Sequence, residues 1–229
     1  MSREADLVDL IQTANEIYLI NPSGNARSAY IQIDDLCELI LKSWLHINVT
    51  GWSPISHQHQ GRDYFKGFNK ITTEVRHALQ NPPLQNRSLH QTVDPLLTGF
   101  EARRTNRNSF FHDHQMTGLT VTDENCLKAF SDLYDLVNAL FPAAFTNHDK
   151  PVLRAQMAAI RVLKKCALSP ADRRQYNNIV NEWRNQETSR TLKTKGELRL
   201  KFANLGYEYC LIHYYPTQFC DALIQAGLL

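Results

Sequence analysis

The sequence of 229 residues has few of the residues that interrupt regular structure, with nine glycines and nine prolines. This scarcity argues against disorder, collagen-like repeats and a glycine-rich β architecture. Long hydrophobic runs are also missing, because charged residues interrupt every apolar stretch before the roughly 20 residues that cross a bilayer, and the charged start MSREADLVDL is unlike a secretory signal. Since 43% of the residues are hydrophobic, we expect a soluble all-α protein with a substantial core and no membrane contact.

The five cysteines are an odd number, widely spaced and without a C-x-x-C pair. Disulfide frameworks and zinc sites need paired or clustered cysteines, so this spacing favours reduced thiols in the cytoplasm, with no metal site. We expect no cofactor. Cys126 lies close enough in sequence to two histidines to suggest a nucleophile, but its position on an apolar helical face predicts a buried thiol.

The net charge of +2 hides two parts of opposite sign. Residues 1–149 hold 12 lysines and arginines against 17 aspartates and glutamates, a balance of −5. Residues 150–229 hold 13 against 6, a balance of +7. The sequence thus predicts a helical bundle over 1–146 and a basic C-terminal unit over 150–229, and the basic unit is a candidate for contact with a polyanion.

Apolar residues recur every three or four positions through most of the first part, which is the period of an amphipathic helix. This pattern predicts helices over residues 2–20, 28–46, 62–79, 89–112 and 124–141, with a loop over 47–61. Segments rich in proline, glycine and asparagine supply the expected helix ends. Asp123 is the expected N-cap of the last of these helices.

The C-terminal unit starts with two basic amphipathic helices, the second with Ser169 as its expected N-cap and Pro170 as its first residue. LGYEYCLIHYY is rich in strand-forming residues, and PTQFCDALIQAGLL has the pattern of a closing helix. These segments are compatible with a winged-helix-like unit or with extra helices packed on the bundle. Aromatic residues alternate with basic ones in this part of the sequence. This pattern predicts nucleic-acid binding, with the rings stacked on bases and the basic side chains on phosphates. The aromatic residues are Tyr176, Trp183, Tyr207 and Tyr209.

The most informative segment is EARRTNRNSFFHDHQ, which concentrates three arginines and two histidines in the otherwise acidic part of the chain. Within it, Arg107-Asn108-Ser109-Phe110-Phe111-His112 is an arginine, a polar residue, three further residues and a histidine. This motif resembles the signature of HEPN domains, helical bundles many of whose members are metal-independent ribonucleases. The resemblance covers roughly residues 25–145 and includes a long early helix with a characteristic set of residues. These are Ala29, Ile33, Asp34, Glu38 and Lys42.

The resemblance implies an endoribonuclease in which Arg107, Asn108 and His112 are catalytic. Histidine exchanges protons near neutral pH and arginine offers a fixed cationic fork, so His112 suits general acid and base catalysis and Arg107 suits phosphate binding. By resemblance, Asn108 binds phosphate or orients its neighbours. We expect Arg103, Arg104 and His114 to bind the RNA substrate.

HEPN ribonucleases usually pair the motif across a two-fold axis, which implies a homodimer with a composite site here. The resemblance alone also suggests a toxin or antiviral defence effector, with an antitoxin or regulatory protein as a further partner. In an ideal helix Arg107 and His112 lie about 140° apart, so they converge only where the helix bends or ends. His114 fits a looser form of the motif, and either histidine stays a candidate.

Two other functions remain open. The chain could be a non-catalytic HEPN-like module that binds nucleic acid or protein, or His112-Asp113-His114 could belong to an HD-type metal-dependent phosphohydrolase that draws further ligands from elsewhere. His57 and His59 alternate in the predicted loop and could hold a metal with outside help, although a solvated loop is the simpler interpretation. The sequence lacks a glycine-rich phosphate loop, G-x-S-x-G and H-E-x-x-H, which argues against nucleotide hydrolysis, serine hydrolysis and zincin proteolysis.

Overall fold

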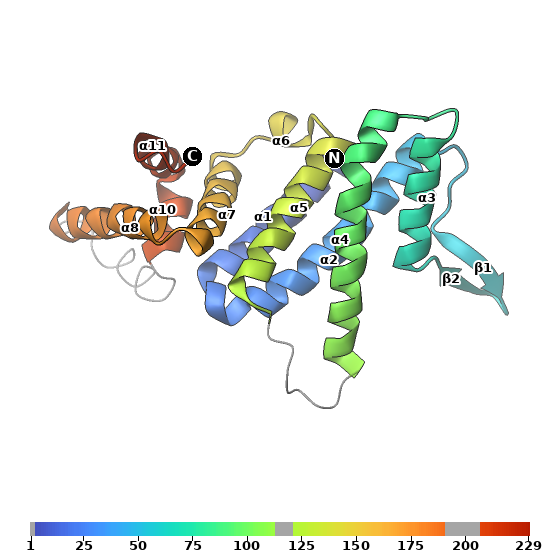
Figure 1. Ribbon diagram of the computed structural model, residues 1–229, viewed down its shortest axis with the longest axis horizontal. Helices are drawn as coiled ribbons and strands as arrows, with labels where there is room; N and C mark the ends of the chain where they lie inside the picture. The colour runs from blue at the N-terminus through green and yellow to red at the C-terminus, as the bar shows by residue number, and fades with distance from the viewer. Residues whose placement is uncertain (1–2, 113–120, 191–206) are drawn as a thin grey trace. The chain divides into compact units, whose positions relative to one another are not determined.

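The computed structural model of the protein is mostly helical, and it describes residues 3–112, 121–190 and 207–229 (Figure 1). These ranges contain ten helices and one two-stranded hairpin. The expectation of a mostly helical protein is therefore confirmed. In the same ranges, no helix combines the length and the apolar character that crossing a bilayer demands.

The helices up to residue 147 are α1 (Arg3–Ile20), α2 (Pro22–Asn48), α3 (Phe68–Gln80), α4 (Arg87–His112), α5 (Asp123–Leu140) and α6 (Ala144–Asn147). The strands of the hairpin are β1 (Ile55–His59) and β2 (Arg62–Phe65). The remaining helices are α7 (Pro151–Leu168), α8 (Pro170–Arg190), α10 (Tyr207–Tyr214) and α11 (Pro216–Gln225). The helices predicted over 2–20, 89–112 and 124–141 agree with α1, α4 and α5 to within two residues at each end.

The chain forms two compact units, each assembled from several stretches of sequence. Unit 1 consists of Met1–Leu10, Ile31–Thr120 and Asp132–Asn147, and unit 2 consists of Ile11–Tyr30, Val121–Ser131 and His148–Leu229. Helices α1, α2 and α5 therefore contribute residues to both units. The consecutive domains predicted over 1–146 and 150–229 stay a prediction, and the compact units follow a different, interleaved division.

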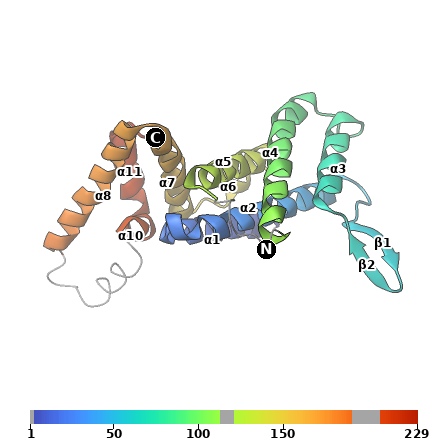
Figure 2. The same cartoon turned by 60° about the horizontal axis from the view of Figure 1, so that its bottom comes forward.

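Unit 1 is organised around α3 and α4, which lie side by side (Figure 2). Helix α3 buries one face, formed by Phe68, Ile71, Thr72, Val75 and Leu79. The buried residues of α4 recur at four- and three-residue spacing, at Val93, Leu97 and Phe100. Burial of such stripes stabilises the pair by about 25 cal/mol for each Å² of apolar surface removed from water. Helix α4 continues through Pro95, whose ring nitrogen has no hydrogen to donate to the preceding turn.

The β1–β2 hairpin replaces residues 55–61 of the loop predicted over 47–61 and the first residues of the helix predicted over 62–79, so both predictions are wrong over 55–65. Its tip is Gln60-Gly61, with φ angles of 51° and 72°. A tight two-residue hairpin turn requires this left-handed backbone at both positions. Every residue of β2 is exposed, so no buried face gave the strands an apolar period in the sequence. Figures 1 and 2 show the hairpin extending away from α3.

Side-chain caps account for two differences between the predicted and the observed helix starts. Helix α2 begins at Pro22, earlier than expected, because the Asn21 side-chain oxygen accepts the N–H of Gly24 at 3.2 Å. Helix α5 is capped by Thr122 rather than Asp123, since the Thr122 hydroxyl accepts the N–H of Asn125 at 3.2 Å.

In unit 2, α7, α8, α10 and α11 pack against one another. The predicted cap of α8 is confirmed, because the Ser169 hydroxyl accepts the N–H of Asp172 at 3.2 Å. The strand predicted in LGYEYCLIHYY is wrong, since Tyr207–Tyr214 is helix α10. Residues 209–212 are all buried, and this burial outweighs their strand propensity. The described part of 150–229 contains no strand, so extra helices fit it better than a winged helix.

Candidate functional site

The predicted site lies in the C-terminal part of α4, which stays helical up to His112. The side chains of Arg107, Asn108 and His112 lie outside the part of the structure that is described, and so does the whole of His114. Their predicted roles stay predictions. What the structure describes is the stretch of α4 that leads into the motif, including Arg103 and Arg104.

Arg103 connects α4 to α5. Its Nη1 donates a hydrogen bond to Oδ2 of Asp132 at 2.7 Å, and the two side chains are only 12% and 18% exposed. The guanidinium carbon also lies 4.0 Å from the ring centre of Phe100, which is one turn earlier on the same helix. A charge pair with this little solvent, supported by a cation–π contact, fixes the direction of the arginine side chain.

Arg104 connects α4 to α2. Its Nη1 lies 2.6 Å from Oε2 of Glu38 and 3.5 Å from Oδ2 of Asp34, which is 2% exposed. The guanidinium carbon lies 4.7 Å from the ring centre of Phe68. Glu38 also pairs with Lys42 at 2.6 Å, so two acids and two cations share this cluster.

The cations keep Glu38 ionised. Burial raises the pKa of this carboxyl, but the hydrogen bond from Lys42 and the charge of Arg104 outweigh that effect and hold the pKa below its usual value. The negative charge of Glu38 therefore persists near neutral pH, where it balances Arg104. Because Arg103 and Arg104 both pair with carboxylates of the protein, they hold the end of α4 in place, and their predicted contact with substrate stays a prediction.

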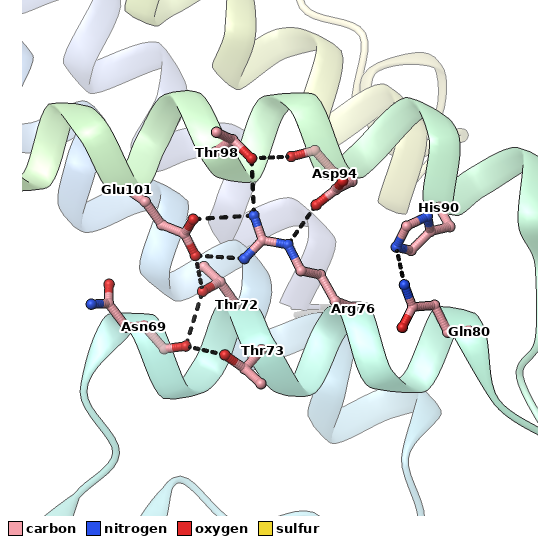
Figure 3. A network of polar contacts seen from close by, with 9 residues as sticks. All are labelled: Asn69, Thr72, Thr73, Arg76, Gln80, His90, Asp94, Thr98 and Glu101. Atoms are coloured by element: carbon pink, nitrogen blue, oxygen red, sulfur yellow. Dashed lines mark hydrogen bonds and ion pairs between the residues drawn. The ribbon is translucent and has the colours of Figure 1, made fainter.

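A third group of polar contacts joins α3 to the middle of α4 (Figure 3). Arg76 of α3 donates from Nε to Asp94 at 2.5 Å, from Nη1 to Glu101 at 2.6 Å, and from Nη2 to the hydroxyl of Thr98 at 3.1 Å. Thr72 donates a further hydrogen bond to Glu101. The Arg76 hydrogen bonds are the main reason that the pKa of Glu101 lies below its usual value.

This network is only partly visible in the sequence. Asp94, Thr98 and Glu101 share a face of α4 because they are four and three positions apart, and this spacing was visible in the sequence. The register that brings Arg76 of α3 opposite them was not visible. Together with Arg103 and Arg104, the network fixes α4 from Asp94 to three residues before Arg107.

No protein-family model, curated protein or solved structure gives a significant match to this chain. The HEPN resemblance therefore stays a prediction from the motif and its context.

His57 and His59 lie exposed on β1, and the His57 ring stacks on Tyr64. Among the described residues, no three histidines, cysteines, aspartates or glutamates gather as metal ligands would. Cys126 is buried as predicted, and burial raises the pKa of its thiol to about 12, which disfavours the nucleophilic thiolate.

In the C-terminal part, the interpretation of the aromatic residues as base-binding rings is wrong for two of them. Tyr176 and Tyr209 are 1% and 6% exposed and belong to the core of unit 2. Some of the basic residues also serve the protein itself, since Lys164 donates to the Ser131 hydroxyl at 2.9 Å and Lys165 donates to the Leu228 carbonyl at 2.8 Å. Cationic side chains on α8 face solvent, namely those of Arg173 and Arg174.

Proposed function

We propose that the protein is a HEPN-type endoribonuclease that cleaves RNA without a metal, through Arg107, Asn108 and His112. The observation that carries the proposal is the double attachment of α4 to its neighbours just before the motif, by Arg103 to Asp132 and by Arg104 to Glu38. Catalytic side chains need a support fixed to a fraction of an ångström, and partly buried charge pairs on two sides provide one.

The reaction needs two proton transfers. A histidine removes the proton from the ribose 2′-hydroxyl as that oxygen attacks the adjacent phosphorus. The bond from phosphorus to the 5′-oxygen breaks, and a protonated histidine delivers a proton to the departing oxygen. The products are a 2′,3′-cyclic phosphate and a 5′-hydroxyl. Arg107 stabilises the extra negative charge on the phosphorane, and Asn108 holds a phosphate oxygen.

A homodimer suits this chemistry. Helix α4 remains helical through His112, and residues five apart in a helix diverge by about 140°. Arg107 of one chain and His112 of a second copy can meet in a composite site without any bend, and two histidines then divide the two proton transfers. A cytoplasmic toxin or antiviral effector, held in check by an antitoxin or regulatory protein, is the biological role that the resemblance suggests.

Cleavage of mixed RNA in EDTA tests the proposal. The wild-type protein should cut and leave cyclic-phosphate ends, while His112→Ala and Arg107→Ala should each lower the rate by about 100-fold or more. The matched control is His77→Ala, which removes an exposed histidine on α3 and should leave the rate unchanged. Comparison with His114→Ala identifies the catalytic histidine. Loss of cleavage by the wild-type protein in EDTA would contradict the mechanism.

A non-catalytic module that binds RNA is the second candidate. The exposed Arg173 and Arg174 of α8 favour it, because they offer charge to phosphates at a distance in sequence from the motif. Wild-type protein that binds RNA with a steep salt dependence, but cuts none in any buffer, would select this function over the first.

A further inference from the structure

The β1–β2 hairpin presents two chemically different faces. The cross-strand pairs His57↔Tyr64 and His59↔Arg62 lie on one face, because opposite residues of a ladder point the same way and alternate residues of a strand share a face. We call these four residues the ring face. The pairs Gln58↔Asp63 and Ile55↔Phe65 belong to the other face, because a register shift between Ile55 and His57 interrupts the alternation along β1.

The ring face carries a stacked pair of rings, in which each ring covers one side of the other and leaves its second side open to a base. The rings of His57 and Tyr64 lie 4.6 Å apart between centres and within 5° of parallel. Tyr64 is 44% exposed. The hairpin has no core of its own to shield, so the ring pair stays available on the surface. Stacking on exposed aromatic rings is how proteins hold unpaired bases.

Arg62 and Asp63 of the hairpin lie on opposite faces. Arg62 and His59 lie on the ring face beside the turn, whereas the acid of the hairpin, Asp63, lies on the other face and accepts a hydrogen bond from Gln58 at 2.6 Å. Arg62 and Tyr64 are two positions apart on one strand, about 7 Å. One nucleotide spans a similar distance between its base and its phosphate.

We propose that the ring face binds single-stranded RNA, with a base stacked on Tyr64 and the neighbouring phosphate on Arg62. The choice of RNA rests on the proposed function. An unpaired strand is required because bases inside a duplex are already stacked and their faces are covered. The ring face carries an arginine and no carboxylate, and this charge suits a phosphate.

Binding of a short fluorescent oligouridylate to the full chain, followed by anisotropy, tests the aromatic contact. Every variant carries His112→Ala as well, so that cleavage cannot distort the affinity. Tyr64→Leu should weaken binding by about fivefold or more, and Tyr64→Phe, which keeps the ring, should stay within about twofold of the parent. Phe65→Leu is the matched control on the other face and should also stay within about twofold.

The salt dependence tests the phosphate contact. Arg62→Gln should lower the slope of log affinity against log salt concentration by about 0.7, the value for one phosphate contact on a single strand. The control Arg87→Gln removes an exposed arginine at the start of α4 and leaves the slope unchanged, although the net charge changes equally.

Three outcomes would overturn the inference. One is equal weakening of RNA binding by Tyr64→Leu and Phe65→Leu. Another is an equal salt slope for Arg62→Gln and Arg87→Gln. The third is a change of oligomeric mass in the hairpin variants with unchanged RNA affinity, which would make the ring face a surface between copies of the chain. Cleavage by the wild-type protein is scored separately, so RNA binding at the hairpin without any cleavage would contradict the proposed function alone.

Discussion

A carboxyl group in unit 1 and one in unit 2 have pKa values that are shifted in opposite directions. In unit 1, Glu101 faces the Arg76 guanidinium and its pKa is lowered. In unit 2, burial raises the pKa of Glu208, although the hydrogen bond from Tyr176 and the charge of Arg173 act in the other direction. The charge of Arg76 thus favours the ionised form of Glu101, whereas burial favours the neutral form of Glu208. The contrast predicts different responses to mutation and to pH.

The largest effect is expected where a charge pair of unit 1 is broken. Asp132→Ala leaves Arg103 in its nearly closed surroundings without an acceptor and should lower the free energy of unfolding by about 2–3 kcal/mol. Urea unfolding followed by circular dichroism measures this loss. The control Asp135→Ala removes an exposed acid of the same helix and should cost less than about 0.5 kcal/mol. Equal losses in the two variants would show that the pair does not stabilise the end of α4.

A smaller effect, with a defined pH dependence, is expected for Glu101→Gln. The folded pKa of Glu101 lies below its usual value of 4.5, so its contribution is present above that value and is lost as the pH falls through the folded pKa. Near neutral pH the variant should lose about 0.5–1 kcal/mol, since both partners are partly exposed. Unfolding in urea across this pH range, with the exposed Glu124→Gln as control, checks the result. A loss that persists at acid pH would rule out the ion pair as its source.

The smallest effect has the opposite sign of pH dependence. The folded pKa of Glu208 is raised, so its contribution is complete below the usual value of 4.5 and is lost as the pH rises through the folded pKa. The side chain of Glu208→Gln stays neutral and can still accept the Tyr176 hydroxyl, so the variant should differ from wild type by less than about 1 kcal/mol near neutral pH. In the same unfolding series, the free energy of unfolding of the wild type should fall as the pH rises through the folded pKa of Glu208, and that of the variant should not. An equal fall in both proteins would show that another group causes it.

The sequence predicted helices well where an apolar period and a clear end coincided. Ser169 and Pro170 together marked the start of α8, and the cap is present. The hairpin was not predicted because its residues, apart from the half-buried Ile55, are exposed on both faces, and Gln60-Gly61 is not one of the dipeptides that usually mark a tight hairpin turn. Helix α10 was mistaken for a strand because propensity is local, whereas burial of Cys210 and Ile212 depends on helices far along the chain.

The candidate site was predictable as a cluster but not as a set of contacts. Arg103 and Arg104 stood out in the sequence, and Glu38 belonged to the early helix of the HEPN resemblance. The pairing of Arg104 with Glu38 and of Arg103 with Asp132 depends on how three helices pack together. Neighbouring residues in the sequence do not specify that register, so only the three-dimensional structure revealed which arginines are already paired.

The interleaving of the two units also sets an order of assembly during synthesis. All segments of unit 1 have been made once Asn147 leaves the ribosome, but unit 2 needs His148–Leu229 to pack with stretches made much earlier. One late contact is the hydrogen bond from Tyr209 of α10 to Glu16 of α1. Until then, the packed rings of Tyr18 and Phe130 lack their later neighbours. A nascent chain arrested after Asn147 should therefore bind a hydrophobic dye, and unit 2 is the part of the new protein most exposed to aggregation.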